Sequence, residues 1–216
     1  MVADAVGLGK TFIGLRLIEH YLQSDRRPGY VPRALVVCPA QLRDLVWRKK
    51  LDEFGLKTDI VSQEEMGRKN FEGTRYSRYD IVVVDESHNF RNSGTNRYEN
   101  LMRLVGAGKR DKRIVLLTAT PINNSIYDLY HQIMLMARNQ ERYYQGWGIS
   151  NLKGYFQALS QRRIEITDLI FETMVRRSRQ DVIKRQQAGE IIMIAGKDIK
   201  FRKRQLEQFI YNFEDS

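Results

Sequence analysis

Short apolar runs alternate along the chain with longer stretches in which apolar residues recur every three to four positions. The short runs have the continuous apolar character of strands buried on both faces. They are Arg33–Cys38, Thr58–Val61, Asp80–Val84 and Arg113–Leu117. The longer stretches with helical spacing are Thr11–Leu22, Gln41–Phe54 and Asn124–Ala137. Strands that alternate with helices predict an α/β fold with a mainly parallel sheet flanked by helices.

The pattern changes after residue 137. Residues 138–187 contain no run of the strand type and are rich in arginine, glutamine and aromatic residues, so this part is expected to be mostly helical. Further on, Glu190–Ile194 and Asp198–Phe201 flank Ala195–Lys197. Two apolar runs around a short glycine-containing segment predict a β-hairpin.

Composition narrows the possible functions. The chain has 216 residues, of which 42% are hydrophobic and 29% charged, as in an ordinary soluble globular protein. Its single cysteine, Cys38, excludes an internal disulfide and favours the cytoplasm, and no apolar stretch is long enough to span a membrane. The net charge is +10, and residues 138–204 carry 15 basic and 7 acidic side chains. This excess suits a polyanion such as DNA, and a solvated helical face would give the same count.

A glycine-rich loop precedes the first predicted helix. Its end matches the phosphate-binding pattern G-x-x-x-x-G-K-[ST], with Asp4 in place of the first glycine. The glycines allow a tight turn that points N–H groups at phosphates, Lys10 would reach the β and γ phosphates, and the Thr11 hydroxyl would bind magnesium. This predicts ATP and Mg²⁺ as cofactors; a glycine-rich turn without a ligand is the alternative. The residues expected to hold the nucleotide are Asp4, Ala5, Val6, Gly7, Leu8, Gly9, Lys10 and Thr11.

Two more segments with candidate chemistry end predicted strands. Asp85 is placed to hold the magnesium ion and Glu86 to deprotonate the attacking water, because ligands of α/β sheets bind at strand ends. His88 is expected to take part in coupling hydrolysis to movement. Thr118 and Thr120 end the next strand, where their hydroxyls can bond His88 or Glu86. The structural alternatives are a helix cap at Asp85, a packing role for His88 and a threonine-rich strand end.

With these segments in view, the chain resembles the Swi/Snf-like branch of superfamily-two helicases, a group of DNA-translocating ATPases. Its phosphate loop is similar to that family's D-E-x-G-L-G-K-T, with Ala5 in place of glutamate. The most discriminating likeness is Arg176–Val182, which resembles R-R-[ST]-x-x-D-V, an element that ordinary helicases lack. Three other segments resemble family motifs: Val36–Leu42 followed by Trp47 (V-V-C-P-x-x-L…W), Asp85–His88 (the Asp-Glu-x-His box, with Ser87 where alanine is usual) and Leu117–Asn124 (L-T-A-T-P-x-x-N).

The resemblance implies the first RecA-like lobe of a DNA-dependent ATPase, truncated at both ends. Residues 1–137 would form the ATP-binding lobe, 138–175 a helical protrusion, and 176–216 a linker toward a second RecA-like lobe, missing here, that carries an arginine finger. Duplex DNA is the implied partner, gripped through its sugar-phosphate backbone more than through base edges. The implied DNA contacts are Pro39, Gln41, Ser62, Asn123 and Asn124.

Three other functions account for part of the sequence. A strand-separating helicase or a restriction-type motor shares the motor motifs but not Arg176–Val182. A non-catalytic DNA-binding fragment fits the expectation that most of the strand leading into the phosphate loop is missing, but not the intact Lys10, Asp85 and Glu86. A small-molecule P-loop kinase explains neither Thr118 and its neighbours nor the basic C-terminal third. The favoured hypothesis is the ATP-hydrolysing lobe of a Swi/Snf-like motor on duplex DNA, associated with a prokaryotic nucleoid.

Overall fold

The computed structural model describes residues 1–24, 28–108, 111–191, 193–194 and 197–198. They belong to two compact units, Met1–Arg176 and Arg177–Ser216. Among the helices in these ranges, none has the length and apolar character needed to cross a membrane.

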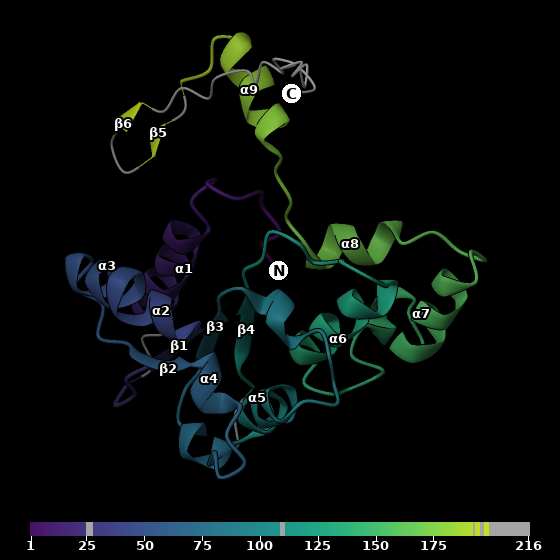
Figure 1. The fold of residues 1–216 in the computed structure, drawn as a ribbon, viewed down its shortest axis with the longest axis horizontal. Coiled ribbons are helices and arrows are strands. Elements are labelled where there is room, and N and C mark those ends of the chain that lie inside the picture. The colour runs from purple at the N-terminus through teal and green to yellow at the C-terminus, as the bar shows by residue number, and fades with distance from the viewer. Residues whose placement is uncertain (25–27, 109–110, 192, 195–196, 199–216) are drawn as a thin grey trace, which may run out of the picture. The chain divides into compact units, whose positions relative to one another are not determined.

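A parallel sheet of four strands forms the centre of the first unit (Figure 1). Its strands are β1 (Ala34–Cys38), β2 (Asp59–Ser62), β3 (Ile81–Val84) and β4 (Arg113–Leu116), in the order β2-β1-β3-β4. Every neighbouring pair is parallel, and all residues of β1 and β3 are buried. The four predicted strands are therefore confirmed, each to within one residue at either end.

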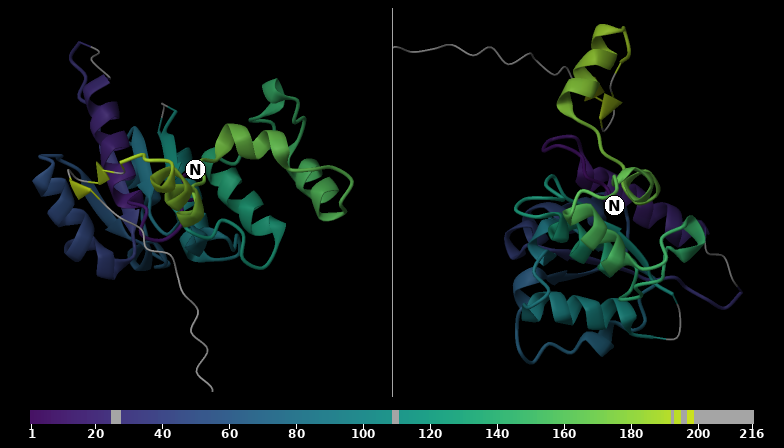
Figure 2. Two further views of the ribbon diagram at one scale, coloured as in Figure 1. Left: turned by 90° about the horizontal axis from the view of Figure 1, so that it is seen from above. Right: turned by 90° about the vertical axis from the view of Figure 1, so that its right-hand side faces the viewer.

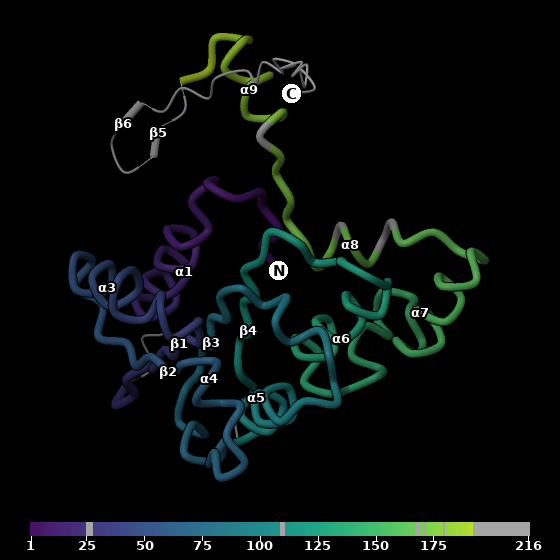
Figure 3. The backbone as a smooth tube through the Cα atoms, in the orientation of Figure 1, coloured from purple at the N-terminus to yellow at the C-terminus, as the bar shows by residue number. Residues whose placement is uncertain are grey.

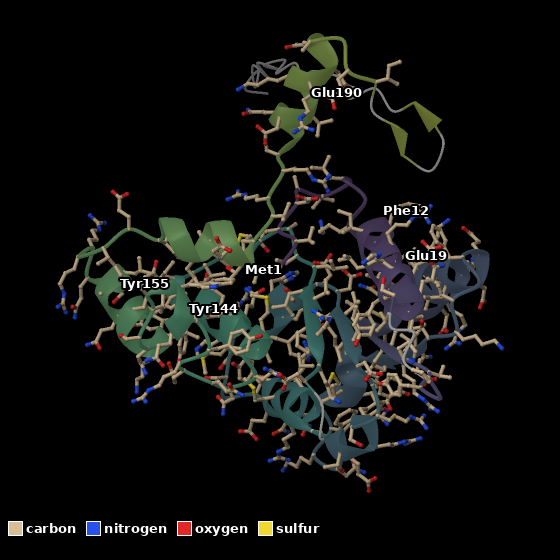
Figure 4. All side chains as sticks on the ribbon, turned by 180° about the vertical axis from the view of Figure 1, so that it is seen from behind. Met1, Phe12, Glu19, Tyr144, Tyr155 and Glu190 are labelled. Carbon is tan, nitrogen blue, oxygen red and sulfur yellow. The ribbon has the colours of Figure 1, made fainter. Side chains whose placement is uncertain are left out.

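The first residues of the chain extend this sheet beyond β4. Val2 forms parallel bridges to Leu117 on one side and to Val175 on the other. The ammonium group of Met1 donates a hydrogen bond to the carbonyl oxygen of Thr173 at 2.6 Å, and Figure 4 shows Met1 close to the helix that ends there. The segment that leads into the phosphate loop therefore lies between Leu117, just after β4, and Val175, two residues after that helix.

Helices cover both faces of the sheet (Figure 2). One face carries α1 (Lys10–Ser24) and the helical segment after β1, which consists of α2 (Ala40–Leu42), the π-helical turn η1 (Arg43–Arg48) and α3 (Lys49–Glu53). The other face carries α4 (Gln63–Met66), α5 (Asn96–Gly106) and α6 (Ile126–Met136), together with the 3-10 turns η2 (Gly73–Tyr76) and η3 (Ser87–Phe90). The three predicted helices are confirmed, and α5 is an additional one.

Alternate strand residues pack into two separate cores, because successive side chains of a strand point to opposite faces. Val82 belongs to the core under α5, with Leu101. Its neighbour Val83 belongs to the core under α1 and η1, with Leu15 and Trp47. The apolar runs thus serve both layers, and the sheet is held from both sides.

The helical part after residue 137 packs against α6. It contains η4 (Gln145–Trp147), α7 (Leu152–Ser160) and α8 (Thr167–Thr173). A third core joins Ile133 of α6 to Tyr144, Leu152 and Phe156, and Figure 4 labels Tyr144 in this region. The mostly helical character that the sequence predicts for this part is confirmed.

The second unit contains α9 (Arg179–Gln187) and an antiparallel pair formed by β5 (Met193–Ile194) and β6 (Lys197–Asp198). Ser178 and Asp181 make a capping box at the start of α9, in which each side chain accepts a hydrogen bond from the other residue's backbone N–H. The serine and the aspartate of the element Arg176–Val182 therefore begin a helix in this structure. The strand pair agrees with the predicted hairpin, with Lys197 in a strand instead of the turn. Residues 192, 195, 196 and 199–201 of that prediction, the turn glycine included, lie outside the described residues.

Gly14 of α1 is a position where an added methyl group is expected to destabilise the fold. A Cβ atom there would lie 2.9 Å from Cη2 of Trp47 and 3.0 Å from Cδ1 of Leu117, both fully buried. Overpacking of this kind costs about 1–3 kcal/mol, more than the gain in helix propensity. Gly154 of α7 is the matched control, because a Cβ atom there meets only Oδ1 of Asn151, at 3.6 Å.

Urea unfolding followed by circular dichroism separates the two substitutions. Gly14→Ala is expected to lower the free energy of unfolding, whereas Gly154→Ala leaves it unchanged or raises it by up to about 1 kcal/mol. Equal stability of the two variants would contradict the packing argument.

Candidate active site

The predicted site residues gather at the carboxyl edge of the sheet. All four strands are parallel, so the loops that follow them leave from the same edge. Pro39, Gln63 and Asp85 follow β1, β2 and β3, and Thr118 lies two residues after the end of β4. Val2 pairs with the end of β4, which brings the phosphate loop to this edge as well. Figure 3 traces the backbone from the N-terminus through this loop into α1.

The phosphate loop turns at two glycines in the left-handed region. Gly7 has a φ of 83° and Gly9 a φ of 78°, values that residues with a Cβ atom rarely adopt. Helix α1 begins at Lys10, so the loop ends at a helix N-terminus, where anions bind readily. The Lys10 ammonium donates to the carbonyl oxygens of Asp4 at 3.0 Å and Ala5 at 3.4 Å, so it lies against the loop itself.

Exposure differs along the loop. Asp4 and Leu8 are buried and anchor it, whereas the Val6 side chain is 67% exposed at its outer bend. Thr11 lies half-buried in the first turn of α1, next to Lys10. The loop therefore has a fixed inner side and an open outer side.

Asp85 is buried, and each of its carboxylate oxygens accepts an N–H. Trp47 Nε1 donates to Oδ2 at 2.8 Å, and the backbone N–H of Glu86 donates to Oδ1 at 2.9 Å. Burial raises the pKa of Asp85 above its usual range, while these hydrogen bonds and the nearby Lys10 ammonium oppose the rise. Gln63 Nε2 donates to the backbone carbonyl of Asp85 at 2.6 Å, so the backbone is fixed too.

Glu86 has a strained backbone and a histidine partner. Its φ of 47° and ψ of 48° lie in the left-handed region, which is uncommon for a non-glycine residue and is found preferentially at functional sites. His88 Nδ1 lies 3.2 Å from Glu86 Oε2 and 3.4 Å from the Thr118 hydroxyl. The hydrogen bond from His88 lowers the pKa of Glu86, and the charges of His88 and Lys10 act in the same direction.

Two buried amide side chains brace this edge. Gln132 of α6 accepts a hydrogen bond from the Ser87 hydroxyl at 2.8 Å and donates to the carbonyl of Pro121 at 2.7 Å. It therefore ties the segment after β3 to the segment after β4. Gln63, besides its bond to the Asp85 carbonyl, accepts a hydrogen bond from Asn89 at 2.8 Å. The sequence signal for Gln132 is a polar residue among the inward-facing positions of α6; for Gln63 there is no local signal.

The structure thus brings five predicted residues together. The charge of Lys10 acts on both Asp85 and Glu86, and His88 contacts Glu86 and Thr118. Thr120 contributes its backbone N–H to the Thr118 hydroxyl oxygen at 3.1 Å, while its own hydroxyl role stays a prediction.

The segments predicted to contact DNA follow β1, β2 and β4 at the same edge, but their residues differ in exposure. Gln41 is exposed, whereas Pro39 and Ser62 are buried. The Ser62 hydroxyl accepts a hydrogen bond from the N–H of Glu65 at 3.1 Å and so caps α4. The loop after β1 is tied to α4, because the N–H of Ala40 donates to the Glu64 carboxylate at 2.8 Å.

The loop before α6 is also fixed. Asn123 and Asn124 are exposed, and their backbone N–H groups donate to the Asp128 carboxylate at 3.0 Å and 2.8 Å. These hydrogen bonds lower the pKa of Asp128, although burial opposes them. Because only the backbone N–H groups are taken up by Asp128, both asparagine side chains remain at the surface, where they bond each other at 3.1 Å.

The donor set suits a magnesium ion shared with phosphates. Among the described residues there is no group of three or more His, Cys, Asp or Glu side chains that could hold a metal ion. Mg²⁺ is usually bound by one or two carboxylates together with substrate phosphates and waters. Asp85 offers one such carboxylate, and the Thr11 hydroxyl in the first turn of α1 is the other oxygen that the sequence predicts as a ligand.

Replacing His88 is expected to change the titration of Glu86. His88→Ala removes the hydrogen bond that is the largest cause of the lowered pKa, so the Glu86 pKa should rise toward the ordinary glutamate range. A carboxyl whose pKa is lowered by folding stabilises the fold above its unfolded pKa, and this stabilisation is lost as the pH falls through the folded pKa. As the pH falls into the acidic range, the variant should therefore lose less folding stability through Glu86 than the wild type does. A ¹³C NMR titration of the carboxyl groups measures the Glu86 pKa in the wild type and in the variant. An unchanged pKa would contradict the role given to His88.

Comparison with known proteins places the chain in a family. The model of the SNF2-related domain matches residues 59–207, more than half of the chain. The uncharacterized ATP-dependent helicase YqhH of Bacillus subtilis (strain 168) is 29% identical over 205 residues, covering 84% of this chain and 33% of YqhH. The probable ATP-dependent DNA helicase CHR23 of Arabidopsis thaliana is 29% identical over 153 residues, covering 60% of this chain and 14% of CHR23. The chain thus spans a third or less of the length of these relatives.

A solved structure agrees with the fold. The Sulfolobus solfataricus SWI2/SNF2 ATPase core in complex with dsDNA superposes with a TM-score of 0.58, covering 84% of this chain and 40% of that one. The sequences are 19% identical, so the likeness concerns the fold, a RecA-like lobe with a parallel sheet between helices. By the match over residues 59–207, the chain belongs to the family of the SNF2-related domain.

Proposed function

We propose that this chain is the ATP-binding and ATP-hydrolysing lobe of a Swi/Snf-like motor that translocates on duplex DNA. One observation carries the proposal: His88 Nδ1 lies 3.2 Å from Glu86 Oε2 and 3.4 Å from the Thr118 hydroxyl, at the sheet edge to which Val2 brings the phosphate loop. A phosphate-binding loop next to a carboxylate pair is suited to nucleotide hydrolysis. The histidine-threonine contact adds a connection from that pair to the loop after β4.

The magnesium ion and the nucleotide fit the residues present. Asp85 and the Thr11 hydroxyl would hold the ion together with the phosphates, and each Asp85 oxygen accepts one N–H and so keeps a lone pair for a ligand. When bound, the ion supplies positive charge at the phosphates. The remaining phosphate charge would be met by Lys10 and by the N–H groups of the loop.

The other residues act on the attacking water and on its consequences. Glu86, kept ionised by His88, would accept a proton from that water. Thr118 lies against His88, so a displacement of Glu86 during hydrolysis would reach the segment before Asn123 and Asn124. This segment would transmit the hydrolysis state to bound DNA.

Duplex DNA is the proposed partner, together with a second RecA-like lobe. The proposed contacts to the sugar-phosphate backbone are Gln41 in α2 and Asn123 and Asn124 in the loop before α6, all exposed. Pro39 and Ser62 are buried and would position the backbone at the start of α2 and α4. Support comes from the SWI2/SNF2 ATPase core, whose structure was solved with dsDNA. The second lobe would complete the active site.

Binding measurements on the purified chain test this function. A fluorescent ATP analogue is expected to bind more tightly with magnesium than with EDTA. A short labelled duplex should bind with an affinity that falls steeply with salt, because phosphate contacts release counterions. A chain that binds neither ligand would refute the proposal.

Acidic substitutions at the exposed Gln41 and Asn124 should weaken duplex binding. Gln41→Glu and Asn124→Asp each place a negative charge next to the expected phosphate path without changing side-chain size, and a loss of roughly threefold to tenfold each is expected from like-charge repulsion of about 1 kcal/mol. Gln157→Glu, on an exposed position of α7, is the matched control. Fluorescence anisotropy at fixed salt compares the three, and equal losses would mean that the loops play no special part.

A further inference from the structure

We propose that Trp47 is a positioning residue for Asp85, with its indole N–H holding the carboxylate in place for a metal ion. The inference rests on the proposed function, in which Asp85 holds magnesium, and assigns a role to a side chain outside the phosphate loop and the carboxylate pair. It concerns a contact between residues 38 positions apart.

The contact is direct and buried. Trp47 is 0% exposed, and its Nε1 lies 2.8 Å from Oδ2 of Asp85. The other oxygen, Oδ1, is held by the backbone N–H of Glu86 at 2.9 Å, and the Asp85 N–H donates to the carbonyl of Val37 at 2.8 Å. Glu86 and Val37 reach Asp85 through backbone groups of the sheet and the adjoining turn. Among the residues that the structure describes, Trp47 is the one whose side chain is shown to donate a hydrogen bond to this carboxylate, and it does so from the helical layer.

The helix that carries Trp47 is irregular at that residue. Residues 43–48 form a π-helical turn between two α-helical pieces, and Trp47 is the buried residue of that turn. Turns of this kind are rare and recur at functional sites. A π-helical turn also changes the direction in which the following side chains point. The irregular turn here coincides with the residue whose indole reaches Asp85.

The indole ring is wedged between α1 and the sheet. A Cβ atom on Gly14 would lie 2.9 Å from the ring, so the helix of the phosphate loop packs directly on Trp47. The same position borders Leu117, the residue after β4, and Val83 of β3. Trp47 therefore lies against α1 and bonds Asp85, and it shares a core with Val83 of the sheet. The helical segment that carries it begins at α2, which bears Gln41.

This arrangement predicts a specific defect. Partners that orient a metal ligand typically change metal affinity by about 10–100-fold when they are removed. Trp47→Phe keeps an aromatic ring in the core and removes the indole N–H together with the outer edge of the ring, which faces Gly14. It should weaken the magnesium dependence of nucleotide binding while leaving the magnesium-free affinity as in the wild type.

Magnesium titrations of the full chain at a fixed concentration of a fluorescent ATP analogue measure this defect. The half-saturating magnesium concentration is expected to rise about tenfold or more in Trp47→Phe. It should stay at the wild-type value in Trp147→Phe, which changes a tryptophan that is 53% exposed. Titrations of the analogue in EDTA should give one affinity for all three proteins.

A second measurement does not depend on the folding of Trp47→Phe. The chain has two tryptophans, so in Trp147→Phe the single indole N–H signal in a ¹H–¹⁵N spectrum belongs to Trp47. The proton of this N–H group should exchange slowly with solvent, because the group is buried and hydrogen-bonded. The signal should shift when magnesium is added to the nucleotide-bound protein.

The outcomes are distinct. A folded Trp47→Phe with the wild-type magnesium response, or an indole signal that does not respond to magnesium, overturns the positioning role and leaves the proposed function intact. A wild-type chain whose nucleotide binding ignores magnesium overturns both. A raised magnesium requirement with an unchanged affinity in EDTA supports the assignment, because a general packing defect would weaken both.

Discussion

Lys10→Ala is expected to weaken binding of an ATP analogue by at least about a hundredfold. The Lys10 ammonium would make charged hydrogen bonds to the β and γ phosphates, and each such bond contributes about 1.5–3 kcal/mol, with 1.4 kcal/mol equal to a factor of ten. In the nucleotide-free structure the same group bonds the carbonyl oxygens of Asp4 and Ala5. The substitution therefore removes both the phosphate contact and a brace of the loop.

Two further variants show that the loss belongs to the Lys10 ammonium and not to the removal of its apolar stem or of any lysine. Lys10→Met keeps the apolar stem of the side chain, and Lys49→Ala removes an exposed lysine of α3 far along the chain from the loop. Fluorescence titration with magnesium should show the large loss for both Lys10 variants and none for Lys49→Ala. Thermal unfolding reports the loss of the brace independently. Binding by Lys10→Ala within threefold of the wild type would rule out the loop as a phosphate site.

Glu86→Gln is expected to abolish hydrolysis while sparing nucleotide binding. General-base catalysis contributes about 10²–10⁴ in rate, and the amide can neither accept the proton of the water nor carry the charge that His88 stabilises. The wild-type chain should itself be slow, because arginine residues from a second lobe typically supply about 10³–10⁵ in phosphoryl transfer. The comparison therefore needs single-turnover conditions, with protein in excess over radiolabelled ATP.

The control for this substitution is Glu72→Gln, an exposed glutamate in the turn before η2. It should hydrolyse ATP at the wild-type rate. Rapid single-turnover hydrolysis by the wild-type chain alone would show that no second lobe is required. Undiminished hydrolysis by Glu86→Gln would move the role of the base to another residue.

The strands could be predicted because their signal is local. A strand buried on both faces needs a short continuous apolar run, and β3 shows this in Ile81–Val84. The phosphate loop is similarly local, since its glycines, lysine and threonine act within one turn. By contrast, α5 is amphipathic and rich in polar residues, and it is recognised as a helix mainly by the core it covers. Its Thr95 cap fits a turn equally well.

The site could be predicted only in part. Asp85, Glu86 and Thr118 are recognisable because strand ends in a parallel sheet present ligands at one edge. Their partners are not, since Trp47 lies 38 residues before Asp85 and Gln132 lies 45 residues after Ser87. A buried tryptophan on a helix has the same sequence pattern whether its N–H meets a carboxylate or a carbonyl.

By itself the sequence determined the elements that depend on neighbours in the chain: the four strands, the phosphate loop and the position of the carboxylates after β3. The tertiary structure decided what each polar group meets. Long-range pairing set the strand order and placed Val2 beside Leu117, and packing between layers set the contact of Trp47 with Asp85. The physical reason is that the pattern of apolar residues specifies which residues are buried. The hydrogen-bond partner of a buried polar group depends instead on which element of the neighbouring layer packs against it.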